Sequence, residues 1–280
     1  MVHPGQLLKE NKLYAGKELG QNFLANPGTA RMIVEKTGIS EQTRVMEIGS
    51  GLGALTIPIA RIASHVTAVE KDSRLIPLLQ KALETEALEN VTVINQDVLT
   101  LDINALAKDK KLVVIGNLPY NISSQILFRL VEERHCIEEA FLMFQKELAN
   151  RIIAPPGGRA YSRLSAVVQY AAAVHFVATI GPASFFPRPE VDSTILNFKF
   201  YKTRSFNQEQ EKMLFDVIKA AFSKRRKSLK NAMVGGGEFD FKKDFVVQAL
   251  ELAGIDDTRR AETLTVEEFK ALTRAVWETS

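Results

Sequence analysis

Apolar residues in the first 130 positions form short unbroken runs that alternate with stretches in which they recur every three or four residues. Short runs are typical of buried strands, and the wider spacing is typical of amphipathic helices. The pattern predicts strands at 44–48, 66–69, 91–94 and 112–115, separated or preceded by helices at 29–36, 55–63 and 74–87. Such alternation builds a parallel sheet, so we expect a doubly wound α/β domain.

The pattern changes near position 200. Further strands are predicted before it, at 140–145, 175–180 and 193–201. Helical spacing follows at 207–222, 243–252 and 265–277, with glycine breaks at 235–237 and 254. The chain is therefore predicted to consist of an α/β domain at 1–202 and a small all-helical domain at 203–280.

The composition describes a globular protein of a reducing compartment. The chain has 280 residues, of which 46% are hydrophobic, enough for one large domain and a smaller one. Its net charge of +3 is mild, and its one cysteine, Cys136, excludes an internal disulfide and a cysteine-cluster metal site. No stretch resembles a signal-peptide core or a membrane span, so we expect a cytoplasmic protein.

Glycines follow the first predicted strand, in the segment EIGSGLGA at 47–54. They let the backbone approach a ligand, and the following helix presents free N–H groups, so a nucleotide-like ligand is expected. The spacing of Gly49, Gly51 and Ala54 also fits a relaxed dinucleotide fingerprint, which leaves a nicotinamide dehydrogenase open. Glu47 favours the cationic methionine end of S-adenosylmethionine instead, because a carboxylate repels pyrophosphate.

Carboxylates also stand at the ends of the next two predicted strands. Glu70 is placed where a carboxylate can accept hydrogen bonds from both hydroxyls of a ribose. Asp97 could accept a hydrogen bond from an exocyclic adenine amine. Alternatively, Glu70 is a solvated surface residue and Asp97 caps a turn or a helix. Because ligands of such sheets bind at the carboxyl ends of the strands, Glu47, Glu70, Asp97 and Asn117 together predict an adenosine site.

The tetrapeptide Asn117-Leu118-Pro119-Tyr120 follows the fourth predicted strand. An amide, a proline-fixed turn and an aromatic ring can hold a flat heterocyclic amine by its edge and its face, which suggests a nucleobase. Alternatively, Asn117 caps a helix at 122–130 and Tyr120 packs in the interior, because Asn and Pro are common in turns.

The motifs of the whole chain resemble those of the rRNA adenine N6,N6-dimethyltransferase family, in its branch that acts on small-subunit rRNA. Besides the glycine loop, Glu70 and Asp97, the matching segments are LGQNFL at 19–24, NLPYNIS at 117–123, YSRLS at 161–165, FFPRPEVDS at 185–193, Phe222 with RRKSL at 225–229, and RAE at 260–262. The resemblance implies a Rossmann-like class I S-adenosylmethionine-dependent methyltransferase domain and a helical domain that recognises RNA.

The resemblance also implies roles for the matching residues. The segment 21–24 would close over the cofactor, Gly49 would approach its methionine moiety, and Asn117 would lie between cofactor and target base. Tyr120 and Phe185 would stack on the two faces of a flipped adenine. The expected cofactor-binding residues are Asn22, Leu24, Glu47, Gly49, Gly51, Glu70, Asp97 and Asn117.

The reaction explains the residue types in the tetrapeptide. The N6 amine of adenine is a poor nucleophile, because its lone pair is delocalised into the ring. Acceptors aimed at its N–H bonds make the nitrogen more tetrahedral, and the candidates are the Asn117 side-chain carbonyl and the Leu118 backbone carbonyl, with Pro119 holding the backbone. No His or Cys stands in a motif position as a general base, so positioning and electrostatics are expected to supply the catalysis.

Cationic residues are concentrated near the start of the predicted helical domain. No acidic residue interrupts the segment between Asp216 and Glu238, which contains Lys219, Lys224, Arg225, Arg226, Lys227 and Lys230. Such a field suits RNA phosphates, and we expect the last five of these residues to bind RNA from a helix. A solvated helix face is the alternative.

The expected activity is S-adenosylmethionine-dependent N6,N6-dimethylation of two adjacent adenosines near the 3′ end of 16S rRNA, with S-adenosylhomocysteine as the second product. The resemblance further implies a 30S pre-ribosomal partner, a role in subunit biogenesis, a monomer and no metal ion. Two alternatives stay open: a 23S rRNA dimethyltransferase of the macrolide-resistance type, and a non-catalytic assembly factor on the same fold.

Overall fold

The computed structural model describes residues 2–16, 18, 20–108, 110–234 and 241–279. These form two compact units, one of Met1–Ala149 and Ala173–Phe200, the other of Asn150–Ala172 and Tyr201–Ser280. One junction falls near the predicted boundary at 202, but residues 150–172 cluster with the C-terminal helices, which the apolar pattern does not predict. Leu19 and the glycines at 235–237 lie outside the described residues.

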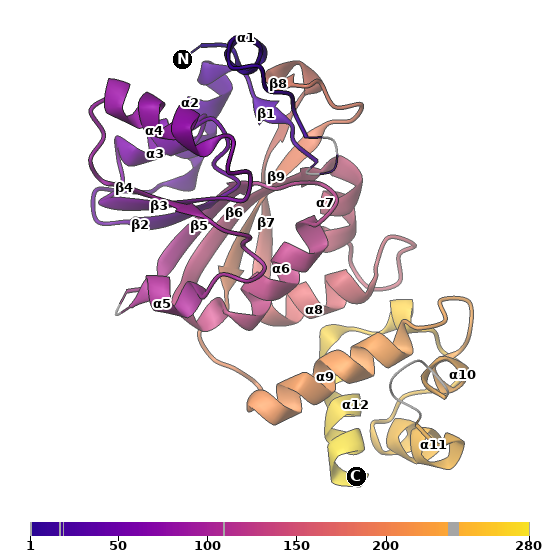
Figure 1. Ribbon diagram of the computed structural model, residues 1–280. Coiled ribbons are helices and arrows are strands. Elements are labelled where there is room, and N and C mark those ends of the chain that lie inside the picture. Colours follow the sequence, from indigo (N-terminus) through magenta and orange to yellow (C-terminus); the bar gives the residue numbers. More distant parts are fainter. Residues whose placement is uncertain (1, 17, 19, 109, 235–240, 280) are drawn as a thin grey trace. The chain divides into compact units, whose positions relative to one another are not determined.

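A seven-stranded sheet forms the centre of the first unit (Figure 1). The strands are β2 (Arg44–Ile48), β3 (His65–Glu70), β4 (Val91–Asn95), β5 (Leu112–Asn117), β6 (Ile137–Gln145), β7 (Ala172–Ile180) and β9 (Ser193–Phe200). Their order is β4-β3-β2-β5-β6-β9-β7, in which the pairs from β4 to β6 are parallel and β9 is antiparallel to β6. Two short strands, β1 (Phe23–Leu24) and β8 (Phe185–Phe186), pair with each other.

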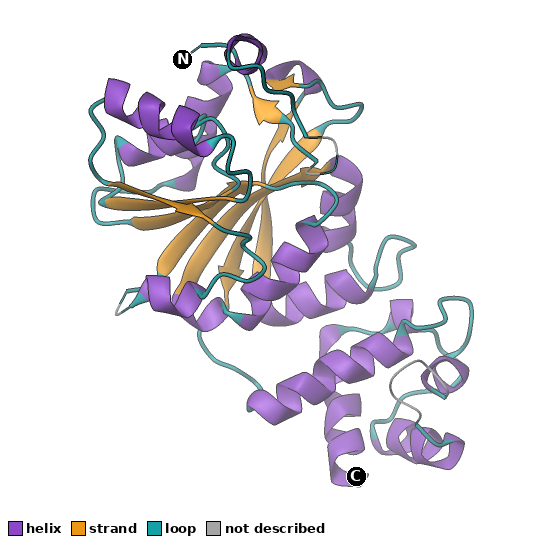
Figure 2. Ribbon diagram, viewed as in Figure 1, coloured by secondary structure: helices purple, strands orange, loops and turns teal. Residues whose placement is uncertain are grey.

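Helices cover both faces of this sheet, as Figure 2 shows, which confirms the predicted α/β fold. The helices of the first unit are α1 (Pro4–Glu10), which packs near β1 and β8, α2 (Pro27–Thr37), α3 (Thr56–Ala60), α4 (Ile76–Thr85), α5 (Ile103–Ala107) and α6 (Ser123–Glu132). Helix α7 (Lys146–Ile153) continues into the second unit. The Asn26 side chain caps α2 by accepting hydrogen bonds from the amides of Gly28 and Thr29, and Gly38 ends it in the left-handed conformation.

Strand β2 is buried from Val45 to Ile48. Val45, Met46 and Ile48 are at most 2% exposed. Val45 belongs to a core cluster that also contains Ile33 and Val34 of α2. Burial of each such side chain contributes about 1.5–3 kcal/mol, so this packing fixes β2 and the loop that follows it.

Each strand predicted from the apolar runs is present. β2 has the predicted limits, whereas β6 begins at 137 instead of 140 and β7 at 172 instead of 175. The predicted helices at 55–63 and 74–87 are shorter, at 56–60 and 76–85. Helices α1, α5, α7 and α8 (Arg163–Ala171) and the strands β1 and β8 were outside the prediction. Two-residue strands have no periodicity to detect.

The chain changes direction across the sheet at β2. Strand β3 pairs with one edge of β2, and β5 pairs with the other. Ligands of open α/β sheets bind at such a switch point, beyond the carboxyl ends of the strands. The glycine loop follows β2 and Asn117 ends β5, and a Cβ added to Gly49 would lie 3.5 Å from the Asn117 carbonyl oxygen. The fold thus brings the two motifs together.

The second unit is helical, as predicted. It contains α8, α9 (Gln208–Ala221), α10 (Leu229–Met233), α11 (Lys243–Leu252) and α12 (Val266–Thr279). Asn207 and Gln210 form a capping box that begins α9, and α9 packs on α12. Leu214, Phe269 and Leu272 are fully buried there. No helix in the described part of the chain has the length and hydropathy that crossing a bilayer requires.

Candidate functional site

A cavity of about 530 Å³ lies at the carboxyl ends of the strands of the first unit. Its walls come from the N-terminal segment, the glycine loop and the residues that end or follow β3, β4 and β5. The predicted site residues that line it are Asn22, Leu24, Glu47, Gly49, Gly51, Glu70, Asp97, Asn117, Leu118 and Pro119. Residues from widely separated parts of the sequence therefore share one cavity.

Glu47 is a buried carboxylic acid in the wall of this cavity. Its side chain is 2% exposed, and its Oε2 has no hydrogen-bond partner among the described residues. Burial, reinforced by the nearby Glu70 carboxylate, raises the pKa of Glu47 to about 8. An unpartnered buried carboxylate oxygen is costly, and a cationic ligand group would satisfy it.

Glu70 connects the end of β3 to the glycine loop. Its Oε2 accepts a hydrogen bond from the Gly51 amide at 2.8 Å, and its Oε1 accepts one from the Asp72 amide at 2.8 Å. Gly51 has a φ of +53°, in the left-handed region that favours glycine. Burial raises the pKa of Glu70, which is 7% exposed. Each carboxylate oxygen can accept a second hydrogen bond, as from a ribose hydroxyl.

Asp97 is already engaged by a neighbouring cation. Its Oδ2 lies 2.8 Å from Nζ of Lys71, and its Oδ1 accepts a hydrogen bond from the Leu99 amide at 3.0 Å. Burial raises the pKa of Asp97, but the Lys71 ammonium and the Leu99 amide outweigh burial and hold it below its ordinary value. The carboxylate is therefore charged at neutral pH and already carries part of its hydrogen bonds.

Asp72, which is absent from the predicted site, ties the N-terminal segment to β3. Its carboxylate, 6% exposed, accepts hydrogen bonds from Arg74 at 2.7 Å and from Nε2 of Gln21 at 2.9 Å. The hydrogen bond from Arg74 holds the pKa of Asp72 below its ordinary value. Oε1 of Gln21 in turn accepts from the Gly16 amide at 2.7 Å. The position of Asp72 two residues after Glu70 was the available sequence signal.

Asn117 has a fixed side-chain orientation. Its Nδ2 donates a hydrogen bond to the Asn22 carbonyl at 2.8 Å, which leaves its side-chain oxygen to accept. The preceding residue must be small, because a Cβ at Gly116 would lie 3.0 Å from the Ile48 carbonyl oxygen. The amide is thus held both by the N-terminal segment and by close packing of β5 against β2.

The two aromatic residues of the predicted base site lie apart from the cavity wall. Neither Tyr120 nor Phe185 is among the described residues that line the cavity. Phe185 is 4% exposed and packs in the core cluster with Leu24, whereas Tyr120 is half-buried and its hydroxyl contacts Ser193. The structure therefore does not present Phe185 as an open stacking face.

Four of the five predicted RNA-binding residues lie on a turn, and for these four the expectation of a helix was wrong. α9 ends at Ala221 and α10 begins at Leu229, so Lys224, Arg225, Arg226 and Lys227 occupy the exposed turn between them. Four consecutive cationic residues offer no apolar face on which a helix could pack. Arg225 donates a hydrogen bond to the Arg159 carbonyl, and Lys230, at the start of α10, pairs with Asp257.

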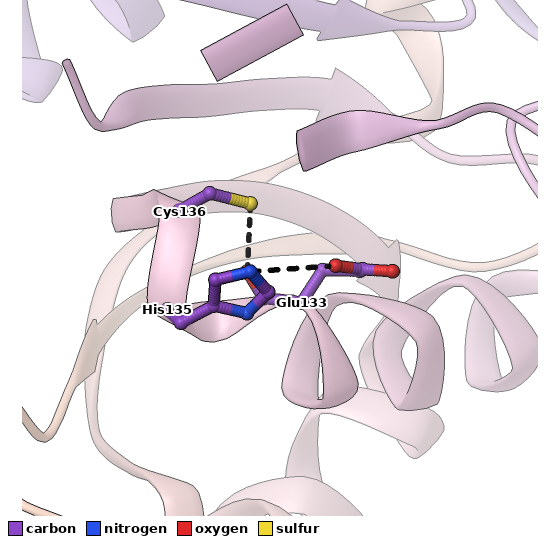
Figure 3. A group of neighbouring side chains, drawn as sticks. All are labelled: Glu133, His135 and Cys136. Atoms are coloured by element: carbon purple, nitrogen blue, oxygen red, sulfur yellow. Dashed lines mark hydrogen bonds and ion pairs between the residues drawn. The ribbon is translucent and has the colours of Figure 1, made fainter. Parts of the chain in front are cut away.

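A group of possible metal ligands lies between α6 and β6 (Figure 3). Ligand atoms of Glu133, His135 and Cys136 lie within 4.8 Å of one another. The Glu133 carboxylate pairs with Arg129 at 3.0 Å, and the Cys136 thiol donates to the Glu133 carbonyl at 3.0 Å. Burial raises the pKa of the thiol, which disfavours the thiolate that binds metals. Contacts within the protein thus account for this arrangement.

The sheet order, the antiparallel β9 beside β6, and the glycine loop followed by an acidic residue on the next strand define a Rossmann-like class I methyltransferase. Enzymes of this class use S-adenosylmethionine. A family model described as ribosomal RNA adenine dimethylase matches residues 13–273. The chain belongs to this family, which confirms the resemblance seen in its motifs, and it is an S-adenosylmethionine-dependent rRNA adenine dimethyltransferase.

Known relatives resemble the chain over nearly its whole length. The ribosomal RNA small subunit methyltransferase A of Desulforapulum autotrophicum is 56% identical over 277 residues, which cover 99% of this chain and 97% of the relative. The protein of the same name from Alkaliphilus metalliredigens is 39% identical, with 96% and 94% covered.

Two solved structures share the fold. A dimethyladenosine transferase from Plasmodium falciparum has a TM-score of 0.76 and 28% identity, with 89% of this chain and 95% of that chain covered. The 23S rRNA methyltransferase ErmE has a TM-score of 0.67 and 24% identity, with 91% and 99% covered.

Proposed function

We propose that this protein dimethylates the N6 amines of two adjacent adenosines near the 3′ end of 16S rRNA, with S-adenosylmethionine as methyl donor, and that it acts in 30S subunit biogenesis. The small-subunit substrate is supported by the names of the two relatives that match the chain nearly from end to end. The observation that carries the proposal is the fixed amide of Asn117 in the cavity wall.

Asn117 and Leu118 are proposed to activate the target amine. The Asn117 nitrogen is committed to the Asn22 carbonyl, so its oxygen is oriented to accept from an N6–H bond. The Leu118 carbonyl would accept from the second N–H bond, and Pro119, which follows it, restricts the backbone conformation of Leu118. Acceptors fixed before the substrate arrives cost no reorganisation during the reaction.

The cavity suits the donor, whose sulfonium supplies an electrophilic methyl group when it is bound. Glu47 offers the unpartnered oxygen to its cationic methionine end, and Glu70 offers its remaining lone pairs to the ribose. We propose that Asn22, Leu24, Gly49 and Gly51 contact the cofactor from the same cavity wall. The Asp97 carboxylate would accept a hydrogen bond from the adenine amine. The amine would either share the carboxylate with the Lys71 ammonium or displace that ammonium.

Tyr120 is the proposed stacking surface for a flipped adenine, because its ring is half-buried and belongs to the turn that holds Asn117. Stacking in the pocket offsets the few kcal/mol that removal of a base from its stack costs. Phe185 can serve as the second surface only if its ring leaves the core cluster.

The basic turn of the second unit is proposed to contact RNA phosphates. Lys224, Arg225, Arg226 and Lys227 are exposed, and Lys230 contributes less because Asp257 pairs with its charge. We further propose that the chain works as a monomer in the cytoplasm. The reaction is proposed to need no metal ion, because a sulfonium methyl group is already electrophilic.

Nucleoside analysis tests the reaction. The protein is incubated with S-adenosylmethionine and 30S particles that lack the modification, and the rRNA is digested and analysed by mass spectrometry. We expect N6,N6-dimethyladenosine with the wild-type chain and none without protein. RNA binding without any methylated nucleoside would contradict the proposal and leave the assembly-factor alternative.

A further inference from the structure

A pair of hydroxyl groups joins two segments of the first unit that are far apart in the sequence. Oη of Tyr120 lies 2.7 Å from Oγ of Ser193. Ser193 is the first residue of β9 and has no exposed surface, whereas Tyr120 is half-buried. The contact therefore ties the tip of a partly accessible ring to the interior of the sheet.

The backbone of Ser193 has a fixed place. Ser193 pairs with Gln145 in the ladder between β9 and β6. Directly before it, the Asp192 carbonyl accepts a hydrogen bond from the Lys146 amide at 3.0 Å, and the Asp192 carboxylate pairs with Nζ of Lys146 at 3.1 Å. The start of β9 is thus anchored at Asp192 and at Ser193.

The backbone of the Tyr120 turn is anchored separately. Oγ of Ser123, a fully buried side chain, donates to the Pro119 carbonyl at 2.8 Å and lies 3.2 Å from the Tyr120 carbonyl. One serine therefore holds the main chain of Tyr120, and a second holds its phenol oxygen. A side chain fixed at both ends has little freedom left in its two torsions.

We propose that Ser193 is a positioning residue for the target base, because its hydroxyl holds the Tyr120 ring in the orientation on which a flipped adenine stacks. The inference rests on the stacking role proposed for Tyr120. A ring that is oriented before RNA binds loses no further rotamer entropy on binding, so removal of the hydroxyl pair should weaken use of RNA without affecting the cofactor.

A double-mutant cycle tests this pairing on the full chain with 30S particles. Ser193→Ala and Tyr120→Phe should each lower kcat/KM for the particles about three- to tenfold, the effect of one net hydrogen bond, and the double variant should lose no more. The cofactor Kd should not change. Ser184→Ala is the matched control, because it removes another hydroxyl pair of the same region, 3.3 Å from Thr29 Oγ1, and should keep wild-type kcat/KM.

Losses that multiply in the double variant would overturn the proposal, because Ser193 would then act independently of the Tyr120 hydroxyl. A wild-type kcat/KM in Ser193→Ala would overturn it as well. Thermal unfolding shows whether Ser193→Ala is folded. If Ser193→Ala is not folded, Tyr120→Phe alone tests the proposal. This variant keeps both the ring and Ser193, and its kcat/KM must still fall about three- to tenfold.

The orientation of the ring can be measured without methyl transfer. The chain has five tyrosines, few enough for their ring carbons to be assigned by NMR after selective 13C labelling. Ser193→Ala should increase the mobility of the Tyr120 ring, and an unchanged ring signal would overturn the proposal. A wild-type chain that methylates no rRNA would instead contradict the proposed function, and the ring measurement would still test Ser193.

Discussion

Two polar side chains at neighbouring strand ends, the buried Glu47 and the partly buried Asn117, differ in how their hydrogen-bonding groups are satisfied. Glu47 has a carboxylate oxygen without a partner among the described residues, and its raised pKa shows the cost of ionising it there. Asn117 has its amide nitrogen bound to the Asn22 carbonyl and is therefore already oriented. At the residue scale, Glu47 should gain from a cationic ligand, whereas Asn117 should act without rearrangement.

Asn117→Ala should reduce methyl transfer about a hundredfold or more, because it removes an acceptor that is fixed before the reaction. Single-turnover kinetics with saturating cofactor measures the effect, and thermal unfolding checks the fold. Asn121→Ala is the matched control, since Asn121 donates to the Glu18 carbonyl at 2.9 Å and anchors the same N-terminal segment. Asn121→Ala should reduce the rate of methyl transfer much less. Near-normal turnover of Asn117→Ala would remove Asn117 from the mechanism.

Glu47 should make the stability of the ligand-free protein dependent on pH. Its pKa is about 8 in the folded chain against an ordinary value of 4.5, so the folded state binds this proton more tightly. The free energy of unfolding should therefore fall as the pH rises from 4.5 to about 8. Glu47→Gln cannot titrate and should show a flatter dependence.

Urea unfolding at pH 5.5 and 8.5 measures this dependence. The exposed Glu41→Gln is the control and should behave as the wild type does. If Glu47→Gln keeps the full wild-type pH dependence, Glu47 is not protonated in the folded state at neutral pH, which contradicts its raised pKa.

At the scale of elements, the segment at 16–24 is held over the strand ends by side chains from three places. Gln21 bonds to Asp72, and the side chains of Asn117 and Asn121 donate to backbone carbonyls of the segment. Among its described residues, 16, 18 and 20–24, the segment contributes only the two-residue strand β1. These side-chain hydrogen bonds add to the pairing of β1 with β8 and to the burial of Leu24 in the core.

Gln21→Ala should raise the Kd for S-adenosylmethionine about three- to tenfold, because it removes the connection between the Gly16 amide and Asp72. Isothermal titration calorimetry without RNA measures it. Gln6→Ala is the control, since Gln6 is exposed on α1 and its amide bonds to Glu10. If the two variants have equal affinities for S-adenosylmethionine, the hydrogen bonds of Gln21 do not contribute to cofactor binding.

The elements that carry the site were predictable because they combine buried strands with unusual residues at their ends. Glu70 and Asn117 end β3 and β5, and Glu47 is the last residue but one of β2. The hydrogen bond of Gln21 to Asp72 and the contact of Tyr120 with Ser193 were not predictable, because they join residues 51 and 73 positions apart. Nor does the pattern of Phe185 show whether its ring faces the cavity or the core.

At the scale of the whole molecule, the cavity and the basic turn at 224–227 lie in different units. The cavity residues belong to the first unit, and the basic turn at 224–227 belongs to the second. The motifs predicted this division. They did not predict that residues 150–172 cluster with the C-terminal helices, because contacts between distant segments leave no periodic signal.

Arg225→Glu combined with Arg226→Glu should weaken RNA binding and make its salt dependence shallower by about two units in the log–log slope. Filter binding over a range of salt concentrations measures both. The exposed pair Lys242→Glu with Lys243→Glu provides the same charge change elsewhere in the unit and should have a smaller effect. Loss of cofactor affinity in the Arg225 and Arg226 double variant would contradict the division between the units.

The choice of substrate is the central claim, and one labelling experiment tests it most directly. The protein is incubated with methyl-labelled S-adenosylmethionine and an equal mixture of 30S and 50S particles from a strain that lacks both modifications, and the label is mapped by position. We predict that it lies in two adjacent adenosines near the 3′ end of 16S rRNA. Label in 23S rRNA, or in no RNA, would contradict the account.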